Sequence, residues 1–257
     1  TDDNPDLVEP FVKRQGMKME YTVGIDNRNR TKRSWMDAAG QKGIPCAFIV
    51  DRENVIQFIG HPMSEEFDEI LVKVMSGRYN LKKQIEAEPS ISAAASYRAG
   101  NSWSEASKAY DNAIKIDEMV FAHLYVEQFN MILIDKKDPE SAYKYITKIM
   151  ITRGAEDPEL LTWIARDIAE NEDIPAKNRK MDFALDTAHT ALSYARSKTD
   201  PKYLSTIAFI HFQNGDIEQA IEWQRKAYFS ARQKDKETYK YDLDSYKTQQ
   251  QHVNAGE

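Results

Sequence analysis

The chain has 257 residues, enough for one large domain or two of ordinary size. Hydrophobic residues make up 41% of it, which permits a buried core, and only 10 glycines and 9 prolines favour a largely helical fold. The net charge of −6 argues against nucleic acid as a partner, and no apolar run reaches the roughly 20 residues that a membrane span needs. The single cysteine, Cys46, excludes an internal disulfide and a cysteine-cluster metal site.

The composition changes near residue 78. Six of the ten glycines fall in residues 1–77, and the 180 residues that follow share four. Strand and helix patterns alternate before this point, and long amphipathic helix patterns with short loops follow it. We therefore expect an α+β domain over residues 1–78 and an all-α domain over residues 79–257.

Helix and strand patterns open the first domain. Apolar residues at helical spacing predict a helix over Leu7–Gln15, ended by Gly16. Period-two alternation over Met19–Ile25 predicts a strand. The segment Thr31–Ala39 is expected to form a second helix, closed by Gly40.

A hairpin and a third helix come next. The apolar run Cys46–Asp51, the turn Arg52–Asn54 and the apolar run Val55–Ile59 together predict two antiparallel strands. Ser64 is the expected N-cap of the helix that follows. The residues expected on the buried side of that helix are Phe67, Ile70, Leu71, Val74 and Met75.

An alanine recurs in the second domain, near the start of the expected second helix of each of several helix pairs. The four alanines are Ala106, Ala142, Ala184 and Ala220, with spacings of 36, 42 and 36 residues. Further small or apolar residues follow seven positions later, namely Ala113, Ile149, Ala191 and Ala227. A small side chain lets two helix backbones approach closely, and the longer middle spacing predicts an insertion at Glu172–Arg179.

This spacing resembles that of tetratricopeptide repeats, which are helix–turn–helix units of about 34 residues. The clearest copies are Ser90–Asp117 and Pro201–Ala231, and the resemblance covers about residues 85–235. His211 and Gln224 depart from the pattern, because the family usually has aromatic residues there. The resemblance implies a tetratricopeptide-like α-helical array that binds a protein or peptide.

Aromatic residues are dense after residue 200. By the same resemblance, Phe209 and Phe212 lie on the concave side of the array, where a partner would dock. The alternative is that the polar C-terminal helix, expected over about Asp235–Gln250, folds back as a cap and covers both rings.

The first domain resembles the later part of the thioredoxin-like redoxin superfamily, and is most similar to its extracytoplasmic thiol-disulfide oxidoreductases. The matching segments are Val8–Gly16, Tyr21–Asp26, Trp35–Gly40, Gly43–Pro45 with the strand after it, and Val55–Pro62. The resemblance implies that Ile44, Pro45 and Cys46 form the cis-proline loop that faces the redox cysteines. It also implies an extracytoplasmic location, although the opening residues show no signal segment.

The redox Cys-x-x-Cys of that family has no counterpart in these 257 residues. By the family's layout it would lie upstream of Thr1, and the two central strands of the sheet are missing as well. The fold expected for residues 1–78 is therefore an incomplete thioredoxin-like segment. Loss of the central strands predicts that Ala47, Ile49 and one edge of the hairpin are exposed.

Two functions follow from these resemblances. The first is part of a thioredoxin-like thiol-disulfide oxidoreductase with a helical protein-interaction domain, silent in these residues because Cys46 has no second thiol to complete a dithiol cycle. The alternative is a non-catalytic protein-binding scaffold, in which the thioredoxin-like part is only a structural platform.

No catalytic residue, metal site or cofactor is assigned from the sequence. Cys46 is either a thiol beside the redox centre or a small apolar strand residue. None of the five histidines is at ligand spacing from another histidine or a cysteine, these being His61, His123, His189, His211 and His252. The chain also lacks a glycine-rich phosphate loop and a nucleophile elbow.

Overall fold

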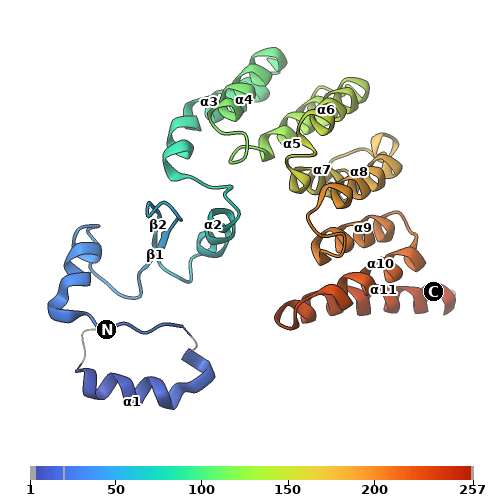
Figure 1. Cartoon of the computed structure of the whole chain (residues 1–257). Helices are drawn as coiled ribbons and strands as arrows, with labels where there is room; N and C mark the ends of the chain where they lie inside the picture. The colour runs from blue at the N-terminus through green and yellow to red at the C-terminus, as the bar shows by residue number, and fades with distance from the viewer. Residues whose placement is uncertain (1–3, 20, 256–257) are drawn as a thin grey trace. The chain divides into compact units, whose positions relative to one another are not determined.

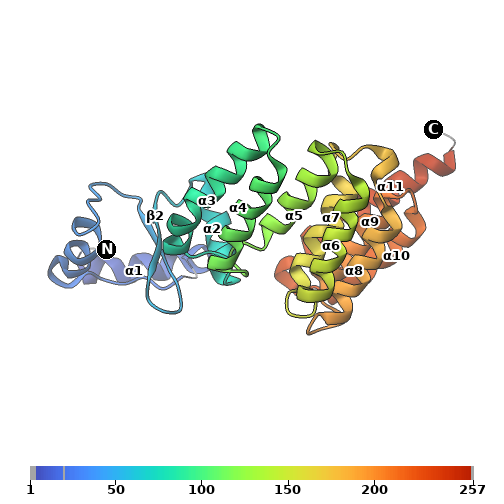
Figure 2. The ribbon, with the colours of Figure 1, turned by 90° about the horizontal axis from the view of Figure 1, so that it is seen from above.

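The computed structural model describes residues 4–19 and 21–255, and it is mostly helical (Figure 1). Contacts within the chain divide it into two compact units, residues 1–81 and residues 82–257. The one sheet of the described residues lies in the first unit, and the described part of the second contains helices and loops (Figure 2). The first unit therefore contains both helices and strands, and the described part of the second unit is all-helical, as the sequence predicts.

The first unit begins with helix α1 (Pro5–Gln15), as predicted. Asn4 caps it, because its side-chain oxygen accepts a hydrogen bond from the backbone N–H of Asp6 at 3.0 Å. Gly16 ends it at a φ of 52°, a left-handed conformation that glycine adopts at little steric cost.

The strand predicted over Met19–Ile25 is wrong. Met19 closes a 3₁₀ turn, η1 (Gly16–Met19), residues 21–26 form no strand, and Glu20 lies outside the described residues. A strand needs a neighbour for its backbone N–H and C=O groups, and the two strands of the described chain pair with each other. Period-two alternation by itself does not supply that neighbour.

The second predicted helix forms as a π-helix. After the 3₁₀ turn η2 (Asn27–Asn29), η3 (Lys32–Asp37) lies within the predicted range Thr31–Ala39. The helix ends at Asp37, two residues before the predicted end at Ala39, and Gly40 follows in the turn at a φ of 66°.

The predicted hairpin is confirmed. Strand β1 (Ala47–Val50) pairs antiparallel with β2 (Ile56–Gly60), and Ile49 lies opposite Phe58. The register shifts next to this pair, so Gln57 is an extra, bulged residue in β2.

One carboxylate holds the turn of the hairpin. Oδ1 of Asp51 accepts hydrogen bonds from the backbone N–H groups of Glu53 at 2.9 Å and Val55 at 2.8 Å. Oδ2 of Asp51 accepts from Nε2 of Gln57, whose Oε1 accepts from the backbone N–H of Leu81 at 2.7 Å. Gln57 is 1% exposed, so these bonds satisfy a buried amide and tie the hairpin to the end of the first unit.

The expected exposure of Ile49 is wrong, because this side chain is 4% exposed, and Ala47 is half-buried. Residues directly opposite in antiparallel strands point to the same face, so Ile49 shares the face of Phe58. The Phe58 ring meets the Phe67 ring of helix α2 (Glu65–Met75) edge to face, with centroids 5.8 Å apart. Helix α2 therefore covers this face of the hairpin in place of further strands.

The apolar stripe predicted on α2 is only partly covered. Its half-buried members are Phe67, Ile70, Leu71 and Val74. Met75 is 70% exposed, which corrects its prediction as a buried residue. Two strands offer too little surface to bury a whole helix face. Ser64 precedes the helix in extended conformation, but its hydroxyl makes no capping hydrogen bond.

The described part of the second unit consists of four helix pairs and a final helix (Figure 1). The pairs are α3 (Leu81–Ala99) with α4 (Trp103–Ile116), α5 (His123–Asn130) with α6 (Pro139–Arg153), α7 (Pro158–Glu170) with α8 (Met181–Tyr194), and α9 (Pro201–Gln213) with α10 (Ile217–Ser230). Helix α5 continues as the π-helix η4 (Met131–Asp135). The 3₁₀ turn η6 (Gln233–Asp235) leads into the final helix, α11 (Lys236–Ala255).

The four recurring alanines are fully buried, each at 0% exposure. Each is the fourth residue of the second helix of its pair, namely Ala106 in α4, Ala142 in α6, Ala184 in α8 and Ala220 in α10. The residues seven positions later are buried too, from Ala227 at 0% to Ile149 at 9% exposure. The methyl side chains leave room for the helix backbones to approach, as the sequence predicts.

The predicted insertion forms the loop between α7 and α8. Residues 171–180 include the 3₁₀ turn η5 (Ala176–Asn178). The hydroxyl of Tyr143 on α6 donates to the carbonyl of Asn178 at 2.9 Å and accepts from the backbone N–H of Lys180 at 3.2 Å. The loop is therefore bonded to the preceding helix pair.

The C-terminal helix α11 packs on the last helix pair. Leu243 and Tyr246 of α11 are buried against Ala208 of α9 and Ala220 of α10. Gln224 of α10 is 0% exposed, and its Nε2 donates to the backbone carbonyl at residue 239 of α11 at 3.0 Å. This end of the helical unit is thus closed by apolar contact and by a buried hydrogen bond.

Candidate functional site

The first helices of the pairs share one surface. Side-chain contacts join residues about one helix pair apart, namely Arg98 of α3 with Glu127 of α5, Asn130 of α5 with Asp167 of α7, and Glu159 of α7 with Lys202 of α9. These contacts place α3, α5, α7 and α9 side by side along the inner side of the curve that the second unit makes in Figure 1.

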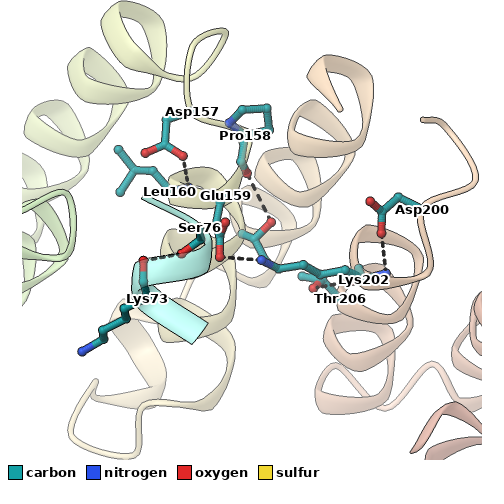
Figure 3. Close-up of polar contacts among 10 residues, drawn as sticks. Lys73, Ser76, Asp157, Pro158, Glu159, Leu160, Asp200, Lys202 and Thr206 are labelled. Atoms are coloured by element: carbon teal, nitrogen blue, oxygen red, sulfur yellow. Dashed lines mark hydrogen bonds and ion pairs between the residues drawn. The ribbon is translucent and has the colours of Figure 1, made fainter. Parts of the chain in front are cut away.

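One edge of this surface is fixed where α7 and α9 begin (Figure 3). Oδ1 of Asp157 accepts from the backbone N–H of Leu160 at 3.1 Å, and Oδ1 of Asp200 accepts from that of Lys202 at 3.0 Å. These bonds cap the two helices. The Lys202 ammonium then lies 2.5 Å from Oε1 of Glu159, so the two capped ends are joined by an ion pair.

A second cluster of charges lies where α3 meets α5. The guanidinium of Arg98 contacts the carboxylate of Asp135, and its Nη1 lies 3.1 Å from Oε2 of Glu127. One cation therefore bridges two carboxylates and links the end of α3 to the second helix pair.

Phe209, a predicted docking residue, lies on this surface and is half-buried. Cζ of Arg166 lies 4.2 Å from the centroid of its ring, a cation–π contact. Nη2 of Arg166 also lies 3.2 Å from Oε2 of Glu170. The surface therefore presents an aromatic ring, partly open to solvent, beside a guanidinium and a carboxylate.

Phe212, the other predicted docking residue, is half-buried against the C-terminal helix. Its ring stacks on Tyr246 with centroids 4.4 Å apart. Burial raises the pKa of Tyr246 to about 12, and the carboxylate of Asp242 contributes to the rise. Helix α11 thus covers part of Phe212, and neither Phe209 nor Phe212 is fully covered.

The residues predicted to form a site in the first unit are those of the loop Ile44–Cys46. The Ile44–Pro45 peptide bond is cis, and Ile44 is 90% exposed. Cys46 is half-buried, and its Sγ lies 4.0 Å from the backbone oxygen of Ala47. The chain contains no second cysteine, so a thiol–disulfide cycle at this loop needs a thiol from another molecule or segment.

The structure also contains a cleft that the sequence analysis missed, between α8, α10 and the loop before α9. Its volume is about 560 Å³, and its lining is Leu192, Lys198, Thr199, Leu204, Glu222, Trp223, Arg225, Lys226, Phe229 and Ser230. Phe229 is 69% exposed, and Nζ of Lys226 lies 4.2 Å from the centroid of the Trp223 ring. The sequence contained one indication of this cleft: Phe229 is a large apolar residue of α10 that does not share the seven-residue spacing of the buried Ala220 and Ala227.

Two histidines lie inside the second unit. His211 is 9% exposed, and its Nδ1 lies 3.2 Å from Oδ2 of Asp216. The His189 ring meets the Trp223 ring edge to face at 5.3 Å, and burial lowers the pKa of His189, with a further contribution from His211. Within the described residues, no group of three or more His, Cys, Asp and Glu side chains is placed to hold a metal ion.

No protein-family model matches this sequence, and no curated protein shows significant similarity to it. Over residues 4–19 and 21–255, no helix combines the length and the apolar character needed to cross a membrane. Three places are candidates on geometry, namely the first-helix surface with Phe209, the loop Ile44–Cys46 and the cleft with Phe229.

Proposed function

We propose that the chain is part of a thioredoxin-like thiol-disulfide oxidoreductase, and that its helical unit is a tetratricopeptide-like domain that binds a protein or peptide. The observation that carries the binding role is the common surface of α3, α5, α7 and α9, on which Phe209 stays partly open to solvent. Contacts between neighbouring first helices hold this surface in one arrangement, so that a partner meets a largely preformed site.

The recurring alanines support the tetratricopeptide resemblance. All four are fully buried at the same position of successive second helices, although the sequence spacing differs by the length of one insertion. A stack of such pairs buries a continuous core and leaves the first helices as one extended surface. This is the surface on which Phe209 lies.

The hairpin, the cis bond at Pro45 and helix α2 support the redoxin resemblance of the first unit. Residues 21–26 depart from it, because they form no strand. Disulfide exchange proceeds when a thiolate attacks one sulfur of a disulfide, and a second thiol then resolves the mixed disulfide. Because Cys46 is the only thiol of this sequence, the loop Ile44–Cys46 contributes contact with the substrate. The two redox cysteines would have to come from another segment or molecule.

The binding role is tested by fluorescence anisotropy, with labelled, reduced and carboxymethylated ribonuclease A as an unfolded protein probe. Phe209→Ala should weaken binding about fivefold, or ~1 kcal/mol, because it removes an aromatic contact. Ile151→Ala is the matched control, since Ile151 is 78% exposed on the second helix α6. Absence of any binding to the wild-type chain, or equal loss in both variants, would contradict this role.

The single cysteine specifically favours the alternative, a non-catalytic protein-binding scaffold. The two functions differ at the loop of Cys46. A peptide whose cysteine is joined to thionitrobenzoate reports on this loop: the Cys46 thiolate attacks the peptide sulfur, the old S–S bond breaks, and thionitrobenzoate leaves as an anion. An oxidoreductase loop should react faster with this peptide than with the same adduct of free cysteine, and a scaffold should show the reverse order. Cys46→Ser is the negative control, because it has no thiol to attack the peptide.

A further inference from the structure

A hydrogen bond between Asn130 and Asp167 joins the second and third helix pairs. Nδ2 of Asn130 donates to Oδ1 of Asp167 at 3.1 Å. The same Oδ1 accepts a second bond from Nδ2 of Asn171 at 3.2 Å. Asn130 is 8% exposed and is the last residue of α5, where the α-helix passes into the π-helix η4. Such π-helical turns are frequent at functional sites.

Asn130 is a polar residue at a position where two other helix pairs have alanine. It stands twelve residues before the recurring Ala142. The residues twelve before Ala106 and Ala220 are Ala94 and Ala208, both at 0% exposure. A polar amide therefore replaces a methyl group at a close helix contact, and packing alone does not explain it.

One atom of each side chain in this pair has no partner. Oδ1 of Asn130 and Oδ2 of Asp167 are both buried, and neither makes a hydrogen bond with the described residues. Oδ1 of Asp167 meanwhile accepts two bonds. An ionised carboxylate accepts through both oxygens, and a buried acceptor without a donor is costly.

A single proton on Oδ2 of Asp167 would give both of these atoms a hydrogen-bond partner. We propose that Asp167 is protonated in the folded protein at pH values at which an exposed aspartate is ionised, and that its Oδ2–H donates to Oδ1 of Asn130. A carboxylic acid and a primary amide have complementary edges, each with one donor and one acceptor. The pair is then a closed ring of two hydrogen bonds without net charge, and it links α5 to α7.

The surroundings of Asp167 favour this neutral form. The titratable groups that act with it are Glu127 of α5, Glu170 of α7 and the phenol of Tyr143 on α6. Burial raises the pKa of Asp167, the two amide hydrogen bonds oppose the rise, and the two carboxylates add to it. Arg98 pairs with Glu127 and Arg166 with Glu170, whereas Nη2 of Arg179 donates to the backbone carbonyls of Asn171 and Ile174. Among described residues, α8 and α9 contribute no charged group to the shift.

Loss of the proton breaks the link. A charged carboxylate has no hydrogen to donate, so its Oδ2 and the amide oxygen of Asn130 are both left as buried acceptors without a donor, and the charge is opposed by the carboxylates of Glu127 and Glu170. The pair therefore acts as a pH-sensitive latch between the two halves of the first-helix surface. Its effect on binding rests on the proposed function, but the protonation itself does not.

The test is Asp167→Asn in the full chain, since an amide at 167 keeps one donor and one acceptor at every pH. Urea unfolding is followed from pH 4 to pH 8, so that the range begins near 3.8, the ordinary value for aspartate. A carboxyl whose folded pKa lies above its unfolded value binds more protons in the folded state between the two values, so stability falls as pH rises through that window. The wild-type midpoint should therefore shift down relative to Asp167→Asn as pH rises. Asp173→Asn, an exposed loop residue, should follow the wild type.

A titration of the wild-type chain by ¹³C NMR keeps the proposal falsifiable if the variant does not fold. The carboxyl carbon of Asp167 should show its inflection above 3.8, the ordinary value for aspartate. An inflection at or below that value, or a midpoint difference that does not change with pH, would overturn the proposal. If the titration holds but binding of the ribonuclease probe does not vary with pH, the effect of the latch on binding is contradicted; if the probe does not bind at any pH, the proposed function is contradicted and the protonation of Asp167 stands.

Discussion

The ring of Phe212 stacks on the ring of Tyr246, with centroids 4.4 Å apart and ring planes inclined by 21°. This contact joins α9 to α11, although α10 lies between them in sequence. Gln224 of α10 bonds to the same final helix. Helix α11 is therefore held by both helices of the α9–α10 pair.

Tyr246→Ala should destabilise the helical unit by about 3 kcal/mol, because it removes a buried, stacked ring. Tyr241→Ala on the same helix is the matched control, since that ring is 78% exposed and its loss should change the free energy of unfolding by less than about 0.5 kcal/mol. Urea denaturation measures both. Equal losses would contradict a stabilising contact between α11 and α9.

Ala220→Leu should cost about 1–3 kcal/mol, because the added atoms have no room at a fully buried helix contact. Ala95→Leu on α3 is the control, since Ala95 is exposed. Thermal unfolding measures the midpoint of both variants. An unchanged midpoint for Ala220→Leu would remove this alanine from the close contact between helices.

Tyr143→Phe and Tyr145→Phe should differ, although both change α6. The Tyr143 hydroxyl bonds to the backbone of Asn178 and Lys180, so its removal should cost about 1–3 kcal/mol and loosen residues 171–180. The Tyr145 hydroxyl is buried without a hydrogen-bond partner among described residues, so its removal should be neutral or stabilising. Hydrogen exchange of the loop amides and urea unfolding check both. Similar losses would show that the loop is held by other contacts.

Acid should weaken the second unit through His189. Its pKa in the folded protein is lowered from 6.5 by burial, so the unfolded chain binds more protons as the pH falls below about 6.5. Stability from this group is present above that window and is lost below it. His189→Gln should therefore reduce the fall in unfolding midpoint between pH 7.5 and pH 5. An identical fall in the variant would assign the acid sensitivity to other groups.

The histidine effect and the Asp167 effect have opposite signs. Stability from His189 rises with pH over its window, whereas stability from Asp167 falls with pH over its own. The double variant of His189→Gln and Asp167→Asn should show the sum of the two changes. A sum that departs strongly from additivity would mean that the two sites interact.

Local patterns determined much of this fold from sequence alone. The hairpin follows from two apolar runs and a tight turn, because both its strands and its turn lie within about 15 neighbouring residues. The buried alanines follow from their recurrence, because close contact between helix backbones leaves room only for a small side chain. These features depend on spacing along the chain, and spacing is what a sequence displays.

Other features depended on residues far apart in the chain. The alternation of Tyr21–Ile25 did not produce a strand, because the described residues offer it no neighbouring strand to complete its hydrogen bonds. Ile49 became buried because α2 covers the hairpin. Asn130 and Asp167 lie 37 residues apart, and only the stacking of α5 beside α7 brings the amide to the carboxyl. Tertiary structure decided these points because burial and pairing are properties of the partner that a segment finds, which its own sequence does not contain.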